Sequence, residues 1–198
     1  MRSPERSGGT LAPAERGTLL RVARASIEHG LASGRALAVD PASFAPPLRE
    51  PRATFVTLRS AGELRGCVGE LEATRALVAS VADRAFAAAF GDPRFHPLAE
   101  HELADLDLHV SVLLPLAPID AASEAALLRL LRPGVDGLVI DDGRRRATFL
   151  PSVWESLPDA RAFLRELQRK AGMPAGAWPA TMRAWRYEVE EFGAAESG

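Results

Sequence analysis

The sequence predicts an α+β protein with two unequal lobes. Three observations support this class: strand pairs of hairpin type, amphipathic helices between them, and a hairpin–helix–strand order that occurs twice. The strands are expected to form either antiparallel sheet or a barrel-like core, with the helices flanking it. The repeated order also suggests an internal duplication, in which residues 56–58 correspond to residues 138–140 and Cys67 corresponds to Phe149.

The elements of the first half follow from hydrophobic periodicity and from turn residues. Apolar side chains at helical spacing indicate helices, and β-branched or alternating apolar side chains indicate strands. Gly30 is expected to stop the first helix, and Thr74 is expected to cap the second. The expected elements are a helix over 13–31, a proline-rich loop over 38–51, strands over 53–58 and 64–71, a helix over 75–90 and a strand over 106–114.

The second half repeats these patterns. Ser123 and Asp159 are suitable N-caps, because a short polar side chain accepts a hydrogen bond from the first helical amides. The expected elements are a helix through residue 131, strands over 137–140 and 145–150, a helix through residue 171 and a last strand over 185–190. We expect one domain, with disordered tails on either side. Its bounds are 13–192, its approximate halves are 13–120 and 121–192, and the tails are 1–12 and 193–198.

Composition excludes several classes of protein. The net charge of −2 argues against a dedicated nucleic-acid binder, which carries a basic excess. A single cysteine excludes an internal disulfide and any Cys-rich zinc or iron–sulfur site held by this chain alone. No apolar run approaches the ~20 residues of a membrane span, and the first ten residues lack the apolar core of a signal peptide. We therefore expect a cytoplasmic protein with no membrane partner, no metal and no cofactor.

The most informative motif is Leu-Arg-Gly-Cys-Val-Gly at residues 64–69, because it places the only cysteine between two glycines. Cys67 is the candidate nucleophile or thiol contact, since a nearby cation favours the reactive thiolate. On a regular strand Arg65 would share its face and hold an anionic group. Gly66 and Gly69 would let a ligand approach the backbone amides. The alternative is that Cys67 is a small buried hydrophobe in a strand.

A second candidate region is the rigid loop at residues 91–98, which contains two prolines. Asp92 and His96 are candidates for proton transfer, and Arg94 is a candidate contact for an anionic substrate. In the alternative interpretation the loop is a capped helix exit, in which Asp92 accepts backbone amides and pairs with Arg94. The arginines at residues 144–146 could also recognise an anion, but a solvated hairpin tip is the favoured interpretation.

Four further motifs follow the hexapeptide in order. They are Ala-Ala-Phe-Gly-Asp-Pro-Arg-Phe at 88–95, Val-Ser-Val-Leu at 110–113, Ala-Thr-Phe-Leu-Pro at 147–151 and Lys-Ala-Gly at 170–172. Together the five motifs resemble the AmmeMemoRadiSam system protein A family, also called the AMMECR domain. The resemblance covers nearly the whole chain and implies two unequal lobes with a cleft near the hexapeptide. It also implies association with a Memo-type protein and a radical S-adenosylmethionine enzyme, and makes Ser111 and Thr148 candidate substrate contacts.

Two positions depart from the family pattern. Ser152 stands where the family often has glutamine, and His109 stands where it often has a carboxylate. Two functions stay open at this point. The favoured one is a small-molecule or substrate-binding subunit, with or without Cys67-dependent catalysis, that takes a small anionic ligand. The alternative is a non-catalytic scaffold or adaptor of the same modification system, and nucleic-acid binding is disfavoured.

Overall fold

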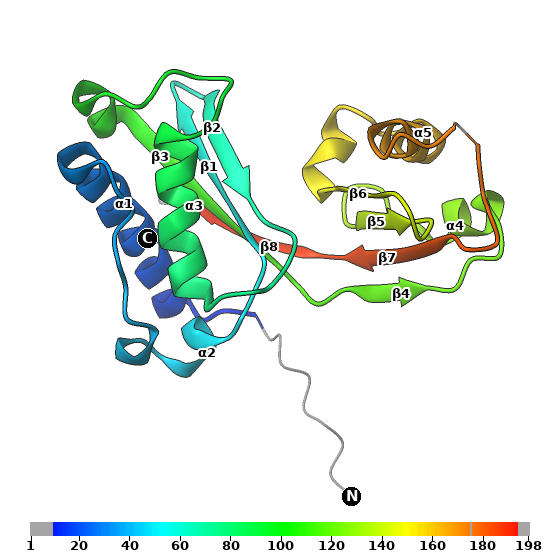
Figure 1. Ribbon diagram of the computed structural model, residues 1–198, viewed down its shortest axis with the longest axis horizontal. Helices are drawn as coiled ribbons and strands as arrows, with labels where there is room; N and C mark the ends of the chain where they lie inside the picture. Colours follow the sequence, from blue (N-terminus) through cyan, green and yellow to red (C-terminus); the bar gives the residue numbers. More distant parts are fainter. Residues whose placement is uncertain (1–9, 175, 194–198) are drawn as a thin grey trace, which may run out of the picture. The chain divides into compact units, whose positions relative to one another are not determined.

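A computed structural model of the chain describes residues 10–174 and 176–193 and shows an α+β fold (Figure 1). The predicted class is confirmed, and antiparallel sheet rather than a barrel-like core is what forms. The chain divides into two compact units. Within the described residues, unit 1 comprises 10–113 and 190–193, and unit 2 comprises 114–174 and 176–189. Unit 2 is therefore an insertion into unit 1, whereas the sequence suggested consecutive halves divided after residue 120.

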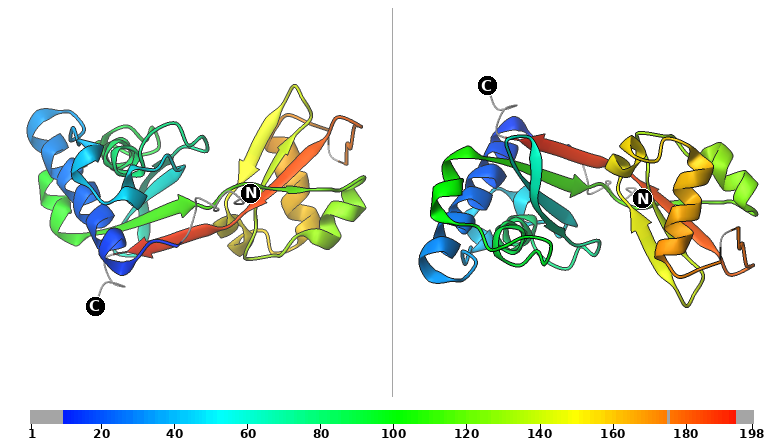
Figure 2. Two further views of the ribbon diagram at one scale, coloured as in Figure 1. Left: turned by 90° about the horizontal axis from the view of Figure 1, so that it is seen from below. Right: turned by 90° about the horizontal axis from the view of Figure 1, so that it is seen from above.

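Unit 1 is a four-stranded sheet with its two long helices on one face (Figures 1 and 2). The strand order is β2-β1-β3-β8, so β2 is an edge strand. The elements are α1 (Pro13–Ser33), the 3₁₀ turn η1 (Pro41–Ser43), α2 (Pro46–Arg49), β1 (Thr54–Ser60), β2 (Glu63–Gly69), α3 (Leu77–Phe90), the 3₁₀ turn η2 (Glu100–Asp105), β3 (Leu106–Leu113) and β8 (Val189–Gly193).

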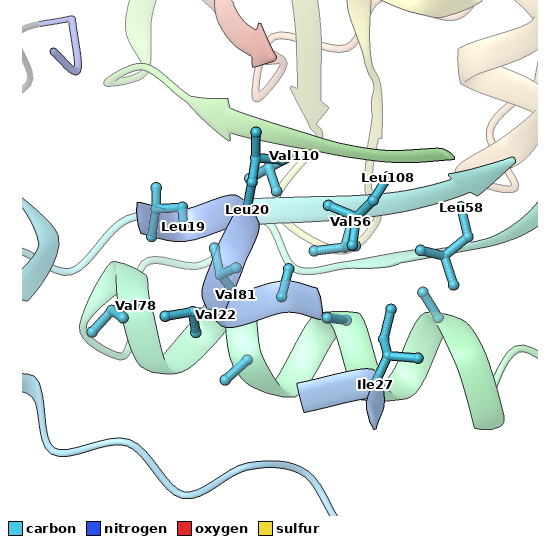
Figure 3. Packing of buried hydrophobic residues seen from close by; sticks show 14 of the residues in the cluster. Leu19, Leu20, Val22, Ile27, Val56, Leu58, Val78, Val81, Leu108 and Val110 are labelled. Atoms are coloured by element: carbon cyan, nitrogen blue, oxygen red, sulfur yellow. The ribbon is translucent and has the colours of Figure 1, made fainter. Parts of the chain in front are cut away.

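The core of unit 1 lies between the sheet and these helices (Figure 3). Alternation along β1 directs Val56 and Leu58 into the core, where both side chains are fully buried. Ile27 of α1 and Val81 of α3 are buried in the same cluster. Alternate residues of β1, such as Thr57, must therefore lie on the sheet face opposite the helices.

Two predicted helix boundaries in unit 1 are wrong. The first helix continues through Gly30 to Ser33 and is capped by Gly34, which adopts the left-handed conformation with φ of 70°. Gly30 instead permits close packing, because a Cβ there would lie 2.4 Å from the Phe90 ring. Thr74 does not cap α3, which begins at Leu77, whose amide donates to the carbonyl of Glu50 at 2.9 Å.

Unit 2 contains a second four-stranded sheet of order β4-β7-β5-β6. Ser123 and Asp159 accept hydrogen bonds from helical amides, so both predicted caps are confirmed. The core is centred on Phe163, which stacks on Trp154 with ring centroids 3.8 Å apart. The elements are β4 (Ala117–Ile119), α4 (Glu124–Leu130), β5 (Gly137–Asp141), β6 (Arg146–Phe149), the 3₁₀ turn η3 (Pro151–Glu155), α5 (Ala160–Lys170) and β7 (Arg183–Tyr187).

The two sheets have the same topology, as the repeated sequence pattern suggested. In each unit a hairpin (β1–β2 or β5–β6) precedes a helix and then a third strand (β3 or β7) that pairs with the first strand of the hairpin. The fourth strand of each sheet follows the third strand of the other unit along the chain. The expected match of Cys67 with Phe149 is wrong by one residue: Thr57 pairs with Cys67, and Val139 pairs with Thr148.

The predicted N-terminal tail is shorter than expected. Leu11 is only 2% exposed, and its amide donates to both carboxylate oxygens of Glu190 at 3.0 Å. Gly193, also expected in a tail, belongs to β8. Residues 1–9 and 194–198 of the predicted tails lie outside the described residues. A search of the described helices finds none with the length and apolar character that crossing a bilayer requires.

Candidate functional site

Cys67 lies on the edge strand β2, on the sheet face opposite the helices. Its neighbour Gly66 faces α3, and alternation along the strand turns the cysteine side chain the other way. Cys67 is paired with Thr57 of β1, and the Thr57 hydroxyl donates to the sulfur with an O–S distance of 3.3 Å. The cysteine is neither fully buried nor fully exposed. The hydroxyl of Thr57 therefore fixes the position of a partly accessible sulfur.

Both glycines of the hexapeptide are explained by packing within unit 1. A Cβ on Gly66 would lie 2.1 Å from the carbonyl oxygen of Ala88 in α3. A Cβ on Gly69 would lie 2.2 Å from the ring of Phe55. Neither glycine has a positive φ, and both belong to strand β2 rather than to a turn. Ligand approach is therefore not needed to explain why these positions lack side chains.

The guanidinium of Arg65 is bound to Glu102 and His96, and the strand is irregular at this residue. The register between β1 and β2 shifts so that Arg65 has no partner position, as in a β-bulge, which redirects a side chain. Its Nε donates to Glu102 at 2.7 Å, and its Nη2 donates to the carbonyl of His96 at 3.0 Å. The hydrogen bond from Arg65 lowers the pKa of Glu102 to about 2. The positive charge of Arg65 is thus paired with the carboxylate of Glu102 in η2, and no hydrogen bond of the described residues joins it to the sulfur of Cys67.

Asp92 and Arg94 hold the backbone of Cys67. The Cys67 amide donates to Asp92 Oδ2 at 2.9 Å, and Arg94 Nη2 donates to the Cys67 carbonyl at 3.3 Å. Arg94 also binds both Asp92 oxygens, at 2.9 and 2.7 Å. Hydrogen bonding from Arg94, together with the Cys67 amide, holds the pKa of the buried Asp92 carboxyl well below its usual range. Such a carboxylate is a poor proton acceptor near neutral pH.

The remaining predicted residues lie in different environments. His96 is exposed, and it is its carbonyl that contacts Arg65. Ser111 is 7% exposed and lies on β3. Thr148 belongs to unit 2 and is 6% exposed, and its hydroxyl donates to the carbonyl of Leu138 at 2.8 Å. The structure therefore brings together the hexapeptide, Asp92 and Arg94, while Thr148 is part of the hydrogen-bonded interior of unit 2.

Two residues near this site were missed from the sequence, Thr57 and Glu102, which contact Cys67 and Arg65 as described above. A third residue, His109, was noted only as a departure from the family pattern. Thr57 is paired with Cys67 of β2 on one side and with His109 of β3 on the other, so these three residues form one row across the sheet. The imidazole of His109 bonds to Asp107 at 2.8 Å and lies over Gly193, since a Cβ there would be 2.8 Å from the ring. Strand alternation was the signal that could have identified Thr57.

The described residues contain no group of three His, Cys, Asp or Glu side chains suited to a metal ion. Hollows lined by described residues lie away from Cys67, among them one in each unit. One, of about 390 Å³, lies between α1 and β3 and is lined by Leu20, Arg21, Arg24, Ala25, Glu28, Leu106 and Leu108. The other, of about 420 Å³, is in unit 2 and is lined by Asp141, Gly143, Ala180, Thr181, Met182 and Arg183. Neither is lined by a residue predicted to act on substrate.

Comparison with known proteins identifies the family. The AMMECR1 family profile matches residues 20–192. A protein of Methanothermobacter thermautotrophicus is 38% identical over 182 residues, covering 88% of this chain and 92% of its own length. A protein of Thermotoga maritima is 33% identical, with 84% and 91% coverage. The crystal structure of uncharacterized protein PH0010 from Pyrococcus horikoshii matches with a TM-score of 0.78 and 32% identity, over 90% of each chain. The chain therefore belongs to the AMMECR1 family.

Proposed function

We propose that this AMMECR1-family protein is a binding subunit of a modification system and that Cys67 is its contact point for substrate. The partners proposed are a Memo-type protein and a radical S-adenosylmethionine enzyme, in line with the resemblance to system protein A, and the proposed location is the cytoplasm. The ligand proposed is a small molecule or substrate group with anionic character.

The observation that carries this proposal is the combination of a constrained backbone and an accessible thiol at Cys67. Asp92 and Arg94 bind its amide and carbonyl, and Thr57 donates to its sulfur. Within the described chain, no carboxylate or imidazole hydrogen-bonds to that sulfur, so the arrangement lacks the adjacent base of a cysteine hydrolase. The geometry favours recognition by a positioned thiol over catalysis by a thiol–base pair.

Alkylation of the native protein tests the thiol. Iodoacetamide should modify Cys67 in the folded protein, and mass spectrometry should locate the adduct on that residue. The Thr57→Val variant keeps the side-chain shape but removes the hydroxyl that holds the sulfur in position, so the alkylation rate should fall several-fold. A sulfur that reacts only after denaturation would contradict the proposal.

Reconstitution tests the partnership. Purified Memo-type protein and radical enzyme should bind the parent chain, and Cys67→Ser should weaken that binding at least about tenfold, which is about 1.4 kcal/mol. The control is Ser152→Ala, because Ser152 is an exposed polar residue outside the site. Equal affinities of parent and Cys67→Ser would exclude the thiol as the contact point.

A scaffold role is the second candidate, and one observation supports it. Leu64 and Leu71, close to the two ends of β2, are 37% and 36% exposed although both are large apolar side chains. Exposed apolar side chains of this kind occur at protein–protein contacts. If docking rather than thiol recognition is the function, Leu64→Ser should abolish partner binding while Cys67→Ser leaves it unchanged.

A further inference from the structure

We propose that Asp92 and Arg94 form an edge cap on strand β2 that prevents a second copy of this chain from adding to the sheet. The cap consists of these two side chains and their hydrogen bonds to Cys67. This inference goes beyond the proposed function: it uses the same two hydrogen bonds to Cys67, but it concerns the association of β2 with another chain and not the recognition of substrate by the thiol.

The first argument is the direction of the Cys67 backbone groups. In an antiparallel sheet the amide and carbonyl of one residue point to the same side of the strand. Those of Cys67 point away from β1, to Asp92 Oδ2 at 2.9 Å and to Arg94 Nη2 at 3.3 Å. One carboxylate acceptor and one guanidinium donor thus occupy the positions that the carbonyl and amide of an adjoining strand would take.

The second argument is that the rest of this edge favours association. β2 is the edge strand, and exposed edges with apolar side chains pair readily with other chains. Leu64 and Leu71, which lie close to the two ends of β2, are both exposed. The irregularity at Arg65 disturbs only the N-terminal part of the strand. The cap at Cys67 therefore protects the regular part of the edge.

The occupant that the cap excludes is a second β2. Two copies of one strand can pair antiparallel about a twofold axis, which makes each contact occur twice. With Cys67 at the axis, the amide and carbonyl of each copy would bond to those of the other. Leu64 and Leu71 would then lie near the two ends of the paired strands, where each would lose part of its exposure to water.

The test removes both side chains of the cap together, so that no buried charge is left unpaired. The Asp92→Ala/Arg94→Ala variant of the full chain should dimerise at least about tenfold more tightly than the parent, measured by light scattering after gel filtration. The matched control is Arg24→Ala/Glu28→Ala, which removes another arginine–carboxylate pair, at 3.1 Å on α1. A folded cap variant that remains as monomeric as the control would overturn the proposal.

Two further measurements locate the new contact. Two Cys67 residues facing each other in an antiparallel pair would have Cα atoms about 5.5 Å apart, which is within disulfide range. Diamide, which takes up the two thiol hydrogens, should therefore cross-link the cap variant but not the parent. Adding Leu64→Lys, which places a charge on the edge, should restore the monomer. A dimer that resists both cross-linking and Leu64→Lys would mean association through another surface and would overturn the proposal.

Discussion

Replacing Gly66 by alanine adds one methyl group at the closest approach of β2 to α3. The added Cβ would lie 2.1 Å from the carbonyl oxygen of Ala88, whereas ordinary van der Waals contact begins at 3.4 Å. The obstacle is helical backbone rather than a flexible side chain, so either the strand or the helix must move by more than 1 Å. Gly66→Ala is therefore expected to destabilise unit 1.

Overpacking a well-packed core costs about 1–3 kcal/mol, and a clash with backbone belongs at the upper end of that range. For a chain of this length, a loss of about 3 kcal/mol lowers the melting temperature by about 6–12 °C. Thermal unfolding followed by circular dichroism measures the shift.

Gly17→Ala is the matched control. Gly17 lies inside α1, and the nearest atom to an added Cβ is Arg21 Nη1 at 3.5 Å. Alanine should stabilise that helix by about 0.5–1 kcal/mol, which is the opposite sign. The packing explanation would fail if Gly66→Ala melted within about 2 °C of the parent, a shift of less than about 1 kcal/mol, while losing ligand or partner binding.

Three other predictions follow from single hydrogen-bonded groups. Because the pKa of Glu102 is lowered to about 2 by Arg65, this ion pair stabilises the fold above pH 4.5, the ordinary carboxyl value, and the contribution is lost as the pH falls toward 2. Glu102→Gln should lower the free energy of unfolding by about 1–2 kcal/mol at neutral pH. It should also flatten the pH dependence of urea unfolding between pH 4.5 and about 2. Parallel stability curves for the parent and the variant would contradict the assignment. Tyr187 is the only tyrosine, and burial raises its pKa to about 12, so ultraviolet titration should show no ionisation around its ordinary value of 10.0. A titration centred near 10.0 would mean that this side chain is exposed. Glu190→Ala should leave the buried Leu11 amide without its acceptor and lower the free energy of unfolding by about 1–3 kcal/mol. Hydrogen exchange at the Leu11 amide should become faster. An unchanged exchange rate would refute the contact.

The elements that could be predicted are those whose pattern is local. Ser123 and Asp159 accept from amides three residues ahead, which sequence spacing captures directly. The long helices and the first hairpin also follow from periodicity, to within a few residues. Strand β4 was missed because three residues are too short to show alternation. The last predicted strand is in fact two strands, β7 and β8. The break between them was not predicted because one alternating pattern runs through it.

The site was harder to predict because its geometry depends on partners distant in sequence. The register shift at Arg65 is set by pairing with β1, and its guanidinium binds Glu102, which is distant in sequence. The need for Gly66 arises from the backbone of Ala88, which no local pattern encodes. The pairing of Asp92 with Arg94 was one of the two interpretations weighed for their loop, and the structure contains it.

The insertion of unit 2 into unit 1 has a consequence for synthesis on the ribosome. Residues 114–188 leave the exit tunnel before β8, so unit 2 has all its strands while the sheet of unit 1 still lacks its fourth. Until β8 emerges, one edge of β3 has no partner strand, and the amide of Leu11 lacks its acceptor, the carboxylate of Glu190. A nascent chain that has emerged only as far as residue 188 would therefore present a complete unit 2 beside an unfinished unit 1, whose β3 edge is open to other chains.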